Sequence, residues 1–557
     1  MSKIILYQIF TRLFGNANTA RIPGGSIEEN GCGKLAAFTP EALAAIKELG
    51  TTHVWYTGII EHATQTDYSH FGIRPDHKAT VKGKAGSPYA IKDYYDVDPD
   101  LATSVPERVK EFENLVKRTH KAGLKVIMDF VPNHVARQYA SDAKPEGVID
   151  LGEEDNKDWA FSAQNNFYYI PGTKLEGHID LAKDAAEPYV EYPAKATGND
   201  RFDAWPDVND WYETVKLNYG VDYQGGRTWH FDPIPNTWMK MRDILLYWAA
   251  KGIDGFRCDM AEMVPCAFWG WVIPQVKEQY PDLIFIAEVY NPNEYRNYIW
   301  GGKFDYLYDK VGLYDTLKAV TCYGQSASAI TGCWQSLEGI QMNMLNFLEN
   351  HDEQRFASDF FGRSAKNTFA PLYVSLYLNT SPFMIYFGEE VGEKGMDHEG
   401  FSGRDGRTTI FDWWSIESIR RLRKVIAEDA YRTMSIQELV AAGLEEKEAE
   451  VFCRFAQATR FASTDPGIRM GTTYDLCYCN FGSEGFDKNR HFAFLRDYQD
   501  HTLLVAANFS NKEAEMSIII PDHAFDWMGI PVNDDIYPGK SIKVTVPPMD
   551  GVVVTLI

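Results

Sequence analysis

IDGFRCD at residues 253–259 is a short, mainly apolar run that ends in an acidic residue. LIFIAEV at residues 283–289 has the same character and carries Glu288 next to its end. Short apolar runs rich in β-branched and aromatic residues, separated by amphipathic stretches, are typical of strands that alternate with helices around a parallel sheet. These two runs therefore predict two strands with an acid at or near the carboxyl end.

Six further runs of this kind bring the predicted strands to eight, namely ILYQIF (5–10), HVWYTGII (53–60), KVIMDFV (125–131), FDYLYD (304–309), MLNFLEN (344–350) and PFMIYFGEE (382–390). The amphipathic stretch 106–122 has Pro106 in its first turn and is followed by Gly123, the start and stop signals of a helix. Eight strands alternating with helices predict an α/β fold of the (β/α)8 barrel (TIM barrel) type.

Two segments depart from this rhythm. Residues 135–228 form a long interval rich in Gly, Asp, Asn and aromatic residues after the third strand, which predicts an inserted domain. Short alternating runs after residue 475 predict a C-terminal antiparallel β-sandwich. The predicted units are the first part of the barrel at 1–134, the insert at 135–228, the second part of the barrel at 229–474 and the sandwich at 475–557.

Acidic residues outnumber basic ones 78 to 55, for a formal net charge of −23. Such a charge repels phosphate backbones and anionic membrane surfaces. No apolar stretch approaches the roughly 18 residues that a membrane helix needs. The sequence therefore predicts no nucleic-acid partner and no membrane partner, favours a neutral substrate, and leaves the oligomeric state open.

The eight cysteines show neither paired CxxC spacing nor the density of a disulfide scaffold, so reduced thiols are expected. The apolar run 4–10 is interrupted by Gln8 and followed by Arg12, without a cleavage site, and is predicted to be a strand rather than a signal peptide. A cytoplasmic location is expected, although a leader that had been removed would leave no trace.

Four of the predicted strands end in residues that could do chemistry. Their motifs read DFVPNH (129–134), GFRCD (255–259), AEVY (287–290) and ENHD (349–352). Because active sites of parallel barrels are built where the strands end, these acids and histidines are expected to gather on one face.

The four motifs, in this order, resemble the signature regions of the α-amylase family, glycoside hydrolase family 13, whose members are retaining α-glucan enzymes. The resemblance covers nearly the whole chain, since IFTRLF (9–14), SPYAIKDYYDVDP (87–99), the insert and the terminal sandwich also match that layout. It implies a glycoside hydrolase that cleaves α-1,4 bonds, and α-1,6 bonds in addition, in maltooligosaccharides or starch-like glucans.

Retaining glycosidases place two carboxyl groups about 5–5.5 Å apart across the scissile bond. By resemblance, Asp259 is the nucleophile, Glu288 is the acid/base, and Asp352 is the third catalytic carboxylate. Arg257 lies two residues before Asp259 and so points to the same side of the strand, where its charge would orient that carboxylate.

Further roles come from the resemblance alone. His134 and His351 match the histidines that bind the sugar before the cleaved bond, and Tyr89 matches the aromatic residue that stacks under it. The chemistry requires no cofactor. Asn133 is a candidate ligand for a structural calcium ion, because the equivalent Asn supplies an oxygen ligand in calcium-dependent members.

The sequence departs from the family pattern after Asp259, where Glu262 and Met263 replace the Lys-His pair that many endo-acting amylases use beyond the cleaved bond. In the insert, VKLN (215–218) resembles a signature of the neopullulanase branch and WPD (205–207) an alternative one. Four tryptophans, at positions 205, 211, 229 and 238, are candidates either for sugar stacking or for packing the insert.

Three functions remain open from sequence alone. The first is hydrolysis. The second is transglycosylation or isomerisation through the same covalent intermediate, with a sugar in place of water as acceptor. The third is a non-catalytic glucan-binding or scaffold protein, against which the joint presence of Arg257, Asp259, Glu288, His351 and Asp352 argues.

Overall fold

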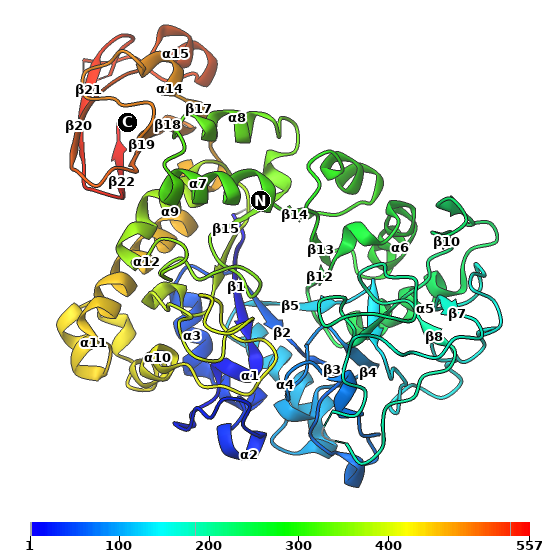
Figure 1. Cartoon of the computed structure of the whole chain (residues 1–557). Coiled ribbons are helices and arrows are strands. Elements are labelled where there is room, and N and C mark those ends of the chain that lie inside the picture. The colour runs from blue at the N-terminus through cyan, green and yellow to red at the C-terminus, as the bar shows by residue number, and fades with distance from the viewer. Residues whose placement is uncertain (1–2, 184, 535) are drawn as a thin grey trace.

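The computed structural model describes residues 3–183, 185–534 and 536–557. Its centre is a closed barrel in which eight parallel strands follow one another in the order β1-β16-β15-β14-β13-β12-β5-β2 (Figure 1). Each predicted run contains one of them: β1 (Ile5–Phe10), β2 (His53–Thr57), β5 (Lys125–Phe130), β12 (Gly255–Cys258), β13 (Ile284–Ala287), β14 (Tyr306–Tyr308), β15 (Met344–Phe347) and β16 (Phe383–Tyr386). The predicted barrel is confirmed.

The barrel strands read as continuous apolar runs because both of their faces are covered. All six residues of β1 are buried, since one face meets the barrel interior and the other meets helices. The helices between and after the strands are α3 (Pro40–Glu48), α4 (Arg108–Lys121), α5 (Asn236–Ala249), α6 (Cys266–Gln279), α7 (Asp315–Tyr323), α8 (Ala329–Gln335), α9 (Phe369–Tyr377), α10 (Glu417–Ala427), α11 (Ile436–Ala442) and α12 (Glu446–Thr464).

The stretch 106–122, predicted as a helix, begins in a short 3-10 turn, Val105–Glu107, and continues as α4. Gly123 ends the helix with a φ of 75°, a conformation that glycine adopts without a steric penalty. Its amide donates to the carbonyl of His120 over 2.8 Å. The start and stop signals in the sequence therefore locate this helix correctly.

The insert consists mostly of loops joined by small antiparallel pairs and lies beside α5 and α6 (Figure 1). The pairs are β6 (His134–Ala136) with β9 (Thr214–Lys216), β7 (Tyr169–Ile170) with β8 (Ala194–Lys195), and β10 (Val221–Asp222) with β11 (Thr228–Trp229). The predicted limits at 135 and 228 both fall inside these strands, which are too short to give an alternating pattern.

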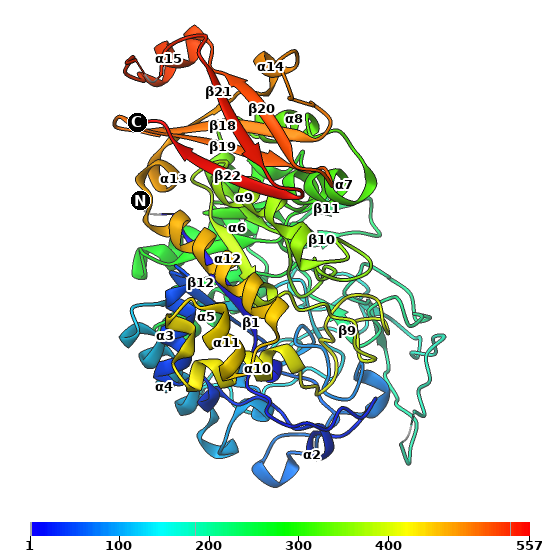
Figure 2. The ribbon, with the colours of Figure 1, turned by 90° about the vertical axis from the view of Figure 1, so that its left-hand side faces the viewer.

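The C-terminal part holds two antiparallel sheets at one end of the molecule, next to α9 (Figure 2). One sheet contains β17 (Thr472–Asp475), β18 (His491–Tyr498), β19 (His501–Asn508) and β22 (Asp550–Thr555), and the other contains β20 (Ala514–Ile519) and β21 (Ser541–Val546). The predicted runs match β18 to β22. The start predicted at 475 lies at the end of β17.

The remaining elements are short. They are the helices α1 (Thr11–Phe14), α2 (Ile27–Asn30), α13 (Pro466–Met470), α14 (Cys477–Asn480) and α15 (Asp522–Met528), and the paired strands β3 (Ile60–His62) and β4 (Ile91–Val97). None of the helices in the described parts of the chain combines the length and the apolar character that a membrane crossing requires.

Candidate active site

The ends of the barrel strands surround a cavity of about 300 Å³. Asp259 follows β12 directly, and Glu288 follows β13 directly. Five of the seven predicted catalytic and sugar-binding residues line this cavity, namely Tyr89, His134, Asp259, Glu288 and Asp352. The other two, Arg257 and His351, are fully buried behind its wall. The structure thus brings all seven together.

Arg257 connects the two carboxylates predicted to react. Its Nη1 donates to Asp259 Oδ1 over 2.7 Å, and its Nη2 lies 2.7 Å from Glu288 Oε2 in an ion pair whose angles fall outside hydrogen-bond geometry. Its Nε donates to the Tyr308 hydroxyl over 3.1 Å. The sequence predicted the contact with Asp259 but not the contact with Glu288, which depends on the pairing of β12 with β13.

The chain turns sharply at Met260, directly after Asp259. Met260 has a φ of 42°, an uncommon left-handed conformation for a residue other than glycine. The turn aims the Met260 amide at Glu288 Oε2, over 2.8 Å. The other carboxylate oxygen, Oε1, accepts a hydrogen bond from the Tyr290 hydroxyl. Both oxygens of Glu288 are therefore held, each by different groups.

His351 lies at the centre of a polar network next to Asp352. Its Nε2 is 2.5 Å from the Tyr89 hydroxyl and 3.0 Å from Asp352 Oδ2, and its Nδ1 is 2.8 Å from Gln8 Nε2. The Tyr89 and His351 rings are stacked with centroids 5.2 Å apart. Burial lowers the pKa of His351 well below its usual value, so this histidine is neutral near pH 7.

His134 also lines the cavity. Burial lowers its pKa to about 3, and its ring centroid lies 5.4 Å from that of Trp211. A neutral imidazole can exchange hydrogen bonds with a sugar without adding charge. Of the four candidate tryptophans, Trp211 lines the cavity, and Trp238 is buried in the protein interior. The other two, Trp205 and Trp229, are exposed.

The carboxyl groups of the site influence one another strongly. Burial raises the pKa of Asp129 to about 6 and that of Asp352 to about 7. Burial also raises the pKa of Asp259 well above its usual range, and Arg257 opposes that rise. Because like charges in a buried site disfavour joint ionisation, these acids do not all ionise near neutral pH.

The surroundings of Asn133 do not fit a calcium ion. Lys216 Nζ donates to Asn133 Oδ1 over 2.7 Å and lies 2.5 Å from Asp200 Oδ1. The amide nitrogen of Asn133 donates to the carbonyl of Gly198 over 2.8 Å. A buried ammonium group takes the oxygen that a metal would need and would repel the metal by its charge. The candidate role of Asn133 as a calcium ligand is therefore not supported.

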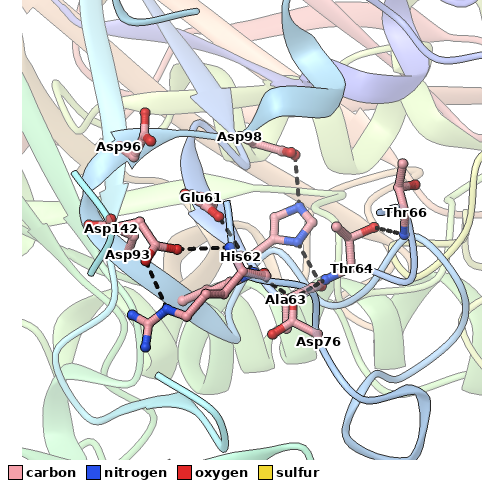
Figure 3. Close-up of polar contacts among 12 residues, drawn as sticks. Glu61, His62, Ala63, Thr64, Thr66, Asp76, Asp93, Asp96, Asp98 and Asp142 are labelled. Atoms are coloured by element: carbon pink, nitrogen blue, oxygen red, sulfur yellow. Dashed lines mark hydrogen bonds and ion pairs between the residues drawn. The ribbon is translucent and has the colours of Figure 1, made fainter. Parts of the chain in front are cut away.

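A second group of buried carboxylates lies on β3 and β4 (Figure 3). Oxygens of Glu61, Asp93 and Asp96 lie within 4.8 Å of one another. Arg108 pairs with both oxygens of Asp96, and burial raises the pKa of Glu61 to about 9, so Glu61 is protonated near pH 7. Lys92 Nζ lies 3.8 Å from Glu61. Arg108 and Lys92 thus place positive charge beside this cluster, while Glu61 Oε2 accepts no hydrogen bond from the described residues.

The cavity also contains residues that the sequence did not single out for function, namely Lys82, Glu213, Tyr290, Phe401, Ile410 and Phe411. Tyr290 could have been found, because it is the last residue of the AEVY motif. The others offered no signal, because they come from loops that only the fold brings to the cavity.

Comparison with known proteins identifies the family to which the chain belongs. Residues 8–452 match the sequence profile described as "Alpha amylase, catalytic domain". Neopullulanase 2 of Thermoactinomyces vulgaris is 24% identical over 406 residues, which are 70% of this chain and 57% of that protein. The α-amylase of Streptomyces lividans is 25% identical over 509 residues, 81% of this chain and 51% of that protein. The chain thus spans little more than half of these relatives.

Solved structures share the fold over the whole chain. The cyclic α-maltosyl-(1→6)-maltose hydrolase of Arthrobacter globiformis, in complex with its cyclic sugar, aligns over 99% of this chain and 98% of its own, with a TM-score of 0.62 and 18% identity. A maltogenic α-amylase of Thermotoga neapolitana aligns over 100% of this chain and 97% of its own, with a TM-score of 0.57 and 18% identity.

Proposed function

The chain belongs to the α-amylase family, and from this membership we propose that it is a retaining glycoside hydrolase acting on α-glucans. Its substrates are maltooligosaccharides or starch-like glucans, in which it cleaves α-1,4 bonds and, as a second target, α-1,6 bonds. The relatives named above are a neopullulanase and an α-amylase, which supports this substrate class.

One observation carries the proposal: Asp259 and Glu288 face the same cavity, and a single guanidinium group contacts both. Retaining glycosidases need two carboxyl groups on either side of one bond, one to attack and one to exchange a proton. Arg257 favours the ionised form of Asp259 by its charge, because the two groups are 2.7 Å apart.

In the proposed reaction, Asp259 attacks the anomeric carbon while Glu288 protonates the leaving oxygen. Water then attacks the glycosyl–Asp259 ester, and Glu288 takes up a proton from that water. Asp352 binds sugar hydroxyl groups and stabilises the positive charge that develops on the sugar ring, with His351 beside it. Tyr89 and His134 complete the walls around this sugar. No step requires a metal ion.

The test combines two substitutions with product stereochemistry. Asp259→Asn and Glu288→Gln should each lower kcat by about 10³-fold or more while the circular dichroism spectrum is unchanged. The first product of the wild-type enzyme, followed by NMR, should carry the α configuration, because two displacements restore the original stereochemistry. A β product at early times, or near-normal turnover in either variant, would refute the proposal.

A specific feature favours transglycosylation as a second activity. A polar cavity of about 280 Å³, lined by Asp200, Tyr223, Arg227, Glu262, Met263, Asn291 and Glu294, includes the loop that follows Met260. A sugar bound there could intercept the glycosyl intermediate in place of water. Chromatography of products formed with excess glucose as acceptor would reveal transfer. Release of reducing ends from maltoheptaose, starch and pullulan distinguishes both activities from a protein that only binds glucan.

A further inference from the structure

A group of aromatic side chains lies on the surface of the C-terminal part, where α14 and α15 form an outer end of the molecule (Figure 1 and Figure 2). We call this group the aromatic platform, and it consists of Tyr474 of β17, Tyr478 of α14, and His523 and Trp527 of α15. Trp527 is 63% exposed and Tyr478 is 49% exposed. Among the described residues, the wall of the central cavity contains none after Phe411, so the platform is separate from the active site.

The rings of the platform are arranged around Tyr474. The centroid of the Tyr474 ring lies 5.7 Å from that of His523 and 5.9 Å from that of Trp527. The Tyr478 ring lies 6.4 Å from Tyr474 and 6.0 Å from His523. These separations are within the range in which aromatic rings attract one another. The angles between the ring planes run from 43° to 62°, so the platform presents its ring faces in several directions.

Hydrogen bonds hold three of these rings in place. The Tyr478 hydroxyl lies 2.5 Å from the Tyr474 hydroxyl and also bonds to His523 Nε2. A surface whose side chains are already fixed loses less conformational entropy when a ligand binds. Each tyrosine hydroxyl is both a donor and an acceptor, so the platform also offers polar groups at the edge of its rings.

The outward position of these rings is not explained by packing. Helix α15 buries Ala524 and Phe525, while His523 and Trp527, four residues apart, share a face that is exposed to solvent. Single exposed apolar residues are ordinary, but exposed apolar side chains gathered in one patch are typical of a surface that binds a partner.

The charge around the platform favours a neutral ligand. Asp522 and Asp526 are exposed on the same helix, and the whole chain carries a formal net charge of −23. Both repel phosphates and other anions. A glucose unit is neutral and combines an apolar C–H face, which stacks on an aromatic ring, with hydroxyl groups at its edge. Because an α-linked glucan bends at each linkage, its successive sugar faces turn in different directions, as the rings of the platform do.

We propose that the aromatic platform is a second binding site for an α-glucan chain, outside the active site. Trp527 and Tyr478 stack against glucose units, and the tyrosine hydroxyls bond to the sugar edges. The choice of an α-glucan as the ligand rests on the proposed function. The platform holds a chain without cutting it, so the preference among soluble substrates remains a property of the central cavity.

Calorimetric titration with maltoheptaose tests this site in the Asp259→Asn background, in which hydrolysis is suppressed. We expect two maltoheptaose molecules per chain. Adding Trp527→Ala or Tyr478→Ala should weaken one of the two sites by about 10-fold or more, the effect of truncating a large aromatic contact, and leave the other unchanged. Adding Trp300→Ala, which removes a tryptophan of similar exposure, 57%, outside the platform, should change neither site.

Two further measurements separate the platform from the active site and from other partners. Trp527→Ala alone should leave kcat/KM for maltotriose unchanged, and the β-linked, straighter chain of cellohexaose should not bind to the platform. A single maltoheptaose per chain, or two sites that persist in Trp527→Ala, would overturn the proposal. If sedimentation velocity showed a wild-type dimer that Trp527→Ala dissociates, the platform would instead be a contact with a second copy. Failure of the proposed function has a different signature, in which the wild type does not cleave maltoheptaose although the platform still binds it.

Discussion

The Tyr290 hydroxyl donates a hydrogen bond to Glu288 Oε1, while the Met260 amide and Arg257 occupy Oε2. Because donors already fill Oε2, the proton that Glu288 delivers in the proposed reaction belongs on Oε1. A hydroxyl group can donate to the ionised carboxylate and accept from the protonated one, so Tyr290 can hold Oε1 in both states. The Tyr290 amide is in turn bound by Glu262 Oε2 over 3.0 Å.

Replacing Tyr290 with Phe should therefore impair proton delivery more than substrate binding. We expect kcat/KM for maltotriose to fall by about 10- to 100-fold, the size typical of a weakened general acid. For α-maltosyl fluoride, whose leaving group needs little protonation, the loss should be below about 3-fold. Because a hydroxyl group stabilises an ionised carboxylate more than a neutral one, the alkaline limb of the maltotriose pH profile should move to higher pH.

Tyr314→Phe is the matched control, since Tyr314 also donates to a glutamate, Glu353, over 3.1 Å but lies outside the cavity. It should change neither the leaving-group dependence nor the pH profile. If Tyr290→Phe lowers activity equally on maltotriose and on the fluoride, Tyr290 is structural rather than a positioning residue.

The barrel could be predicted from the sequence because its strands are buried on both faces and so read as continuous apolar runs. The exact limits of the insert could not be predicted in the same way, because β6, β9 and β11 have only two or three residues and give no recognisable pattern. The gathering of Asp259, Glu288 and Asp352 at one cavity could be predicted from the motifs. Two contacts could not be predicted from the sequence. The contact of Arg257 with both Asp259 and Glu288 depends on strand register, and that of Lys82 with the Phe411 ring depends on loops far apart in the sequence.

Asp352 should make the folded state less stable at neutral pH than at acid pH. Its pKa is raised to about 7 in the folded chain, mainly by burial, from roughly 3.9 in an unfolded chain. Between these values the folded state binds more protons, so the free energy of unfolding falls as the pH rises. Asp352→Asn removes this dependence and should raise Tm relative to wild type by on the order of 2 °C at pH 8.

Calorimetry at pH 4 and pH 8 checks this effect. The difference in Tm between Asp352→Asn and wild type should be close to zero at pH 4 and positive at pH 8. Asp359→Asn, which changes an exposed acid on the same loop, should show no such trend. If Asp352→Asn had a lower Tm than wild type at pH 8 but not at pH 4, the predicted sign of the Tm difference would be wrong.

Lys216 should stabilise the contact between the insert and the barrel without a metal ion. Lys216→Met leaves Asn133 Oδ1 without its donor and Asp200 without its ion pair, and we expect a loss of about 1–3 kcal/mol in the free energy of unfolding. Denaturant unfolding measures this loss, with the exposed Lys174→Met as control. Excess EDTA should change neither the Tm nor the kcat/KM of the wild type. A fall in Tm with EDTA that calcium reverses would contradict the role of Lys216.

The acceptor side should favour short substrates over intact starch. Many endo-acting amylases have a Lys-His pair after the nucleophile motif, and this chain has Glu262 and Met263. The structure adds that Glu262 Oε2 is already taken by the amides of Tyr290 and Asn291, each over 3.0 Å. It therefore supports the loop beside Glu288 and has less capacity left for sugar hydroxyls. Met263 offers only soft apolar contact.

Long-chain cleavage requires several sugar contacts beyond the cut, and we expect the first of them to be weak in this chain. The kcat/KM should therefore level off along the series from maltotriose to maltoheptaose, and soluble starch should not exceed the best oligosaccharide. The cavity of about 280 Å³ beside Glu262 has further polar side chains, among them Arg227 and Glu294, which we expect to bind one acceptor-side sugar without replacing an extended groove. Arg227→Ala should thus lower kcat/KM for maltotriose and maltoheptaose by a similar factor. A steep rise with chain length, with starch as the best substrate, would show instead that other loops provide the missing contacts.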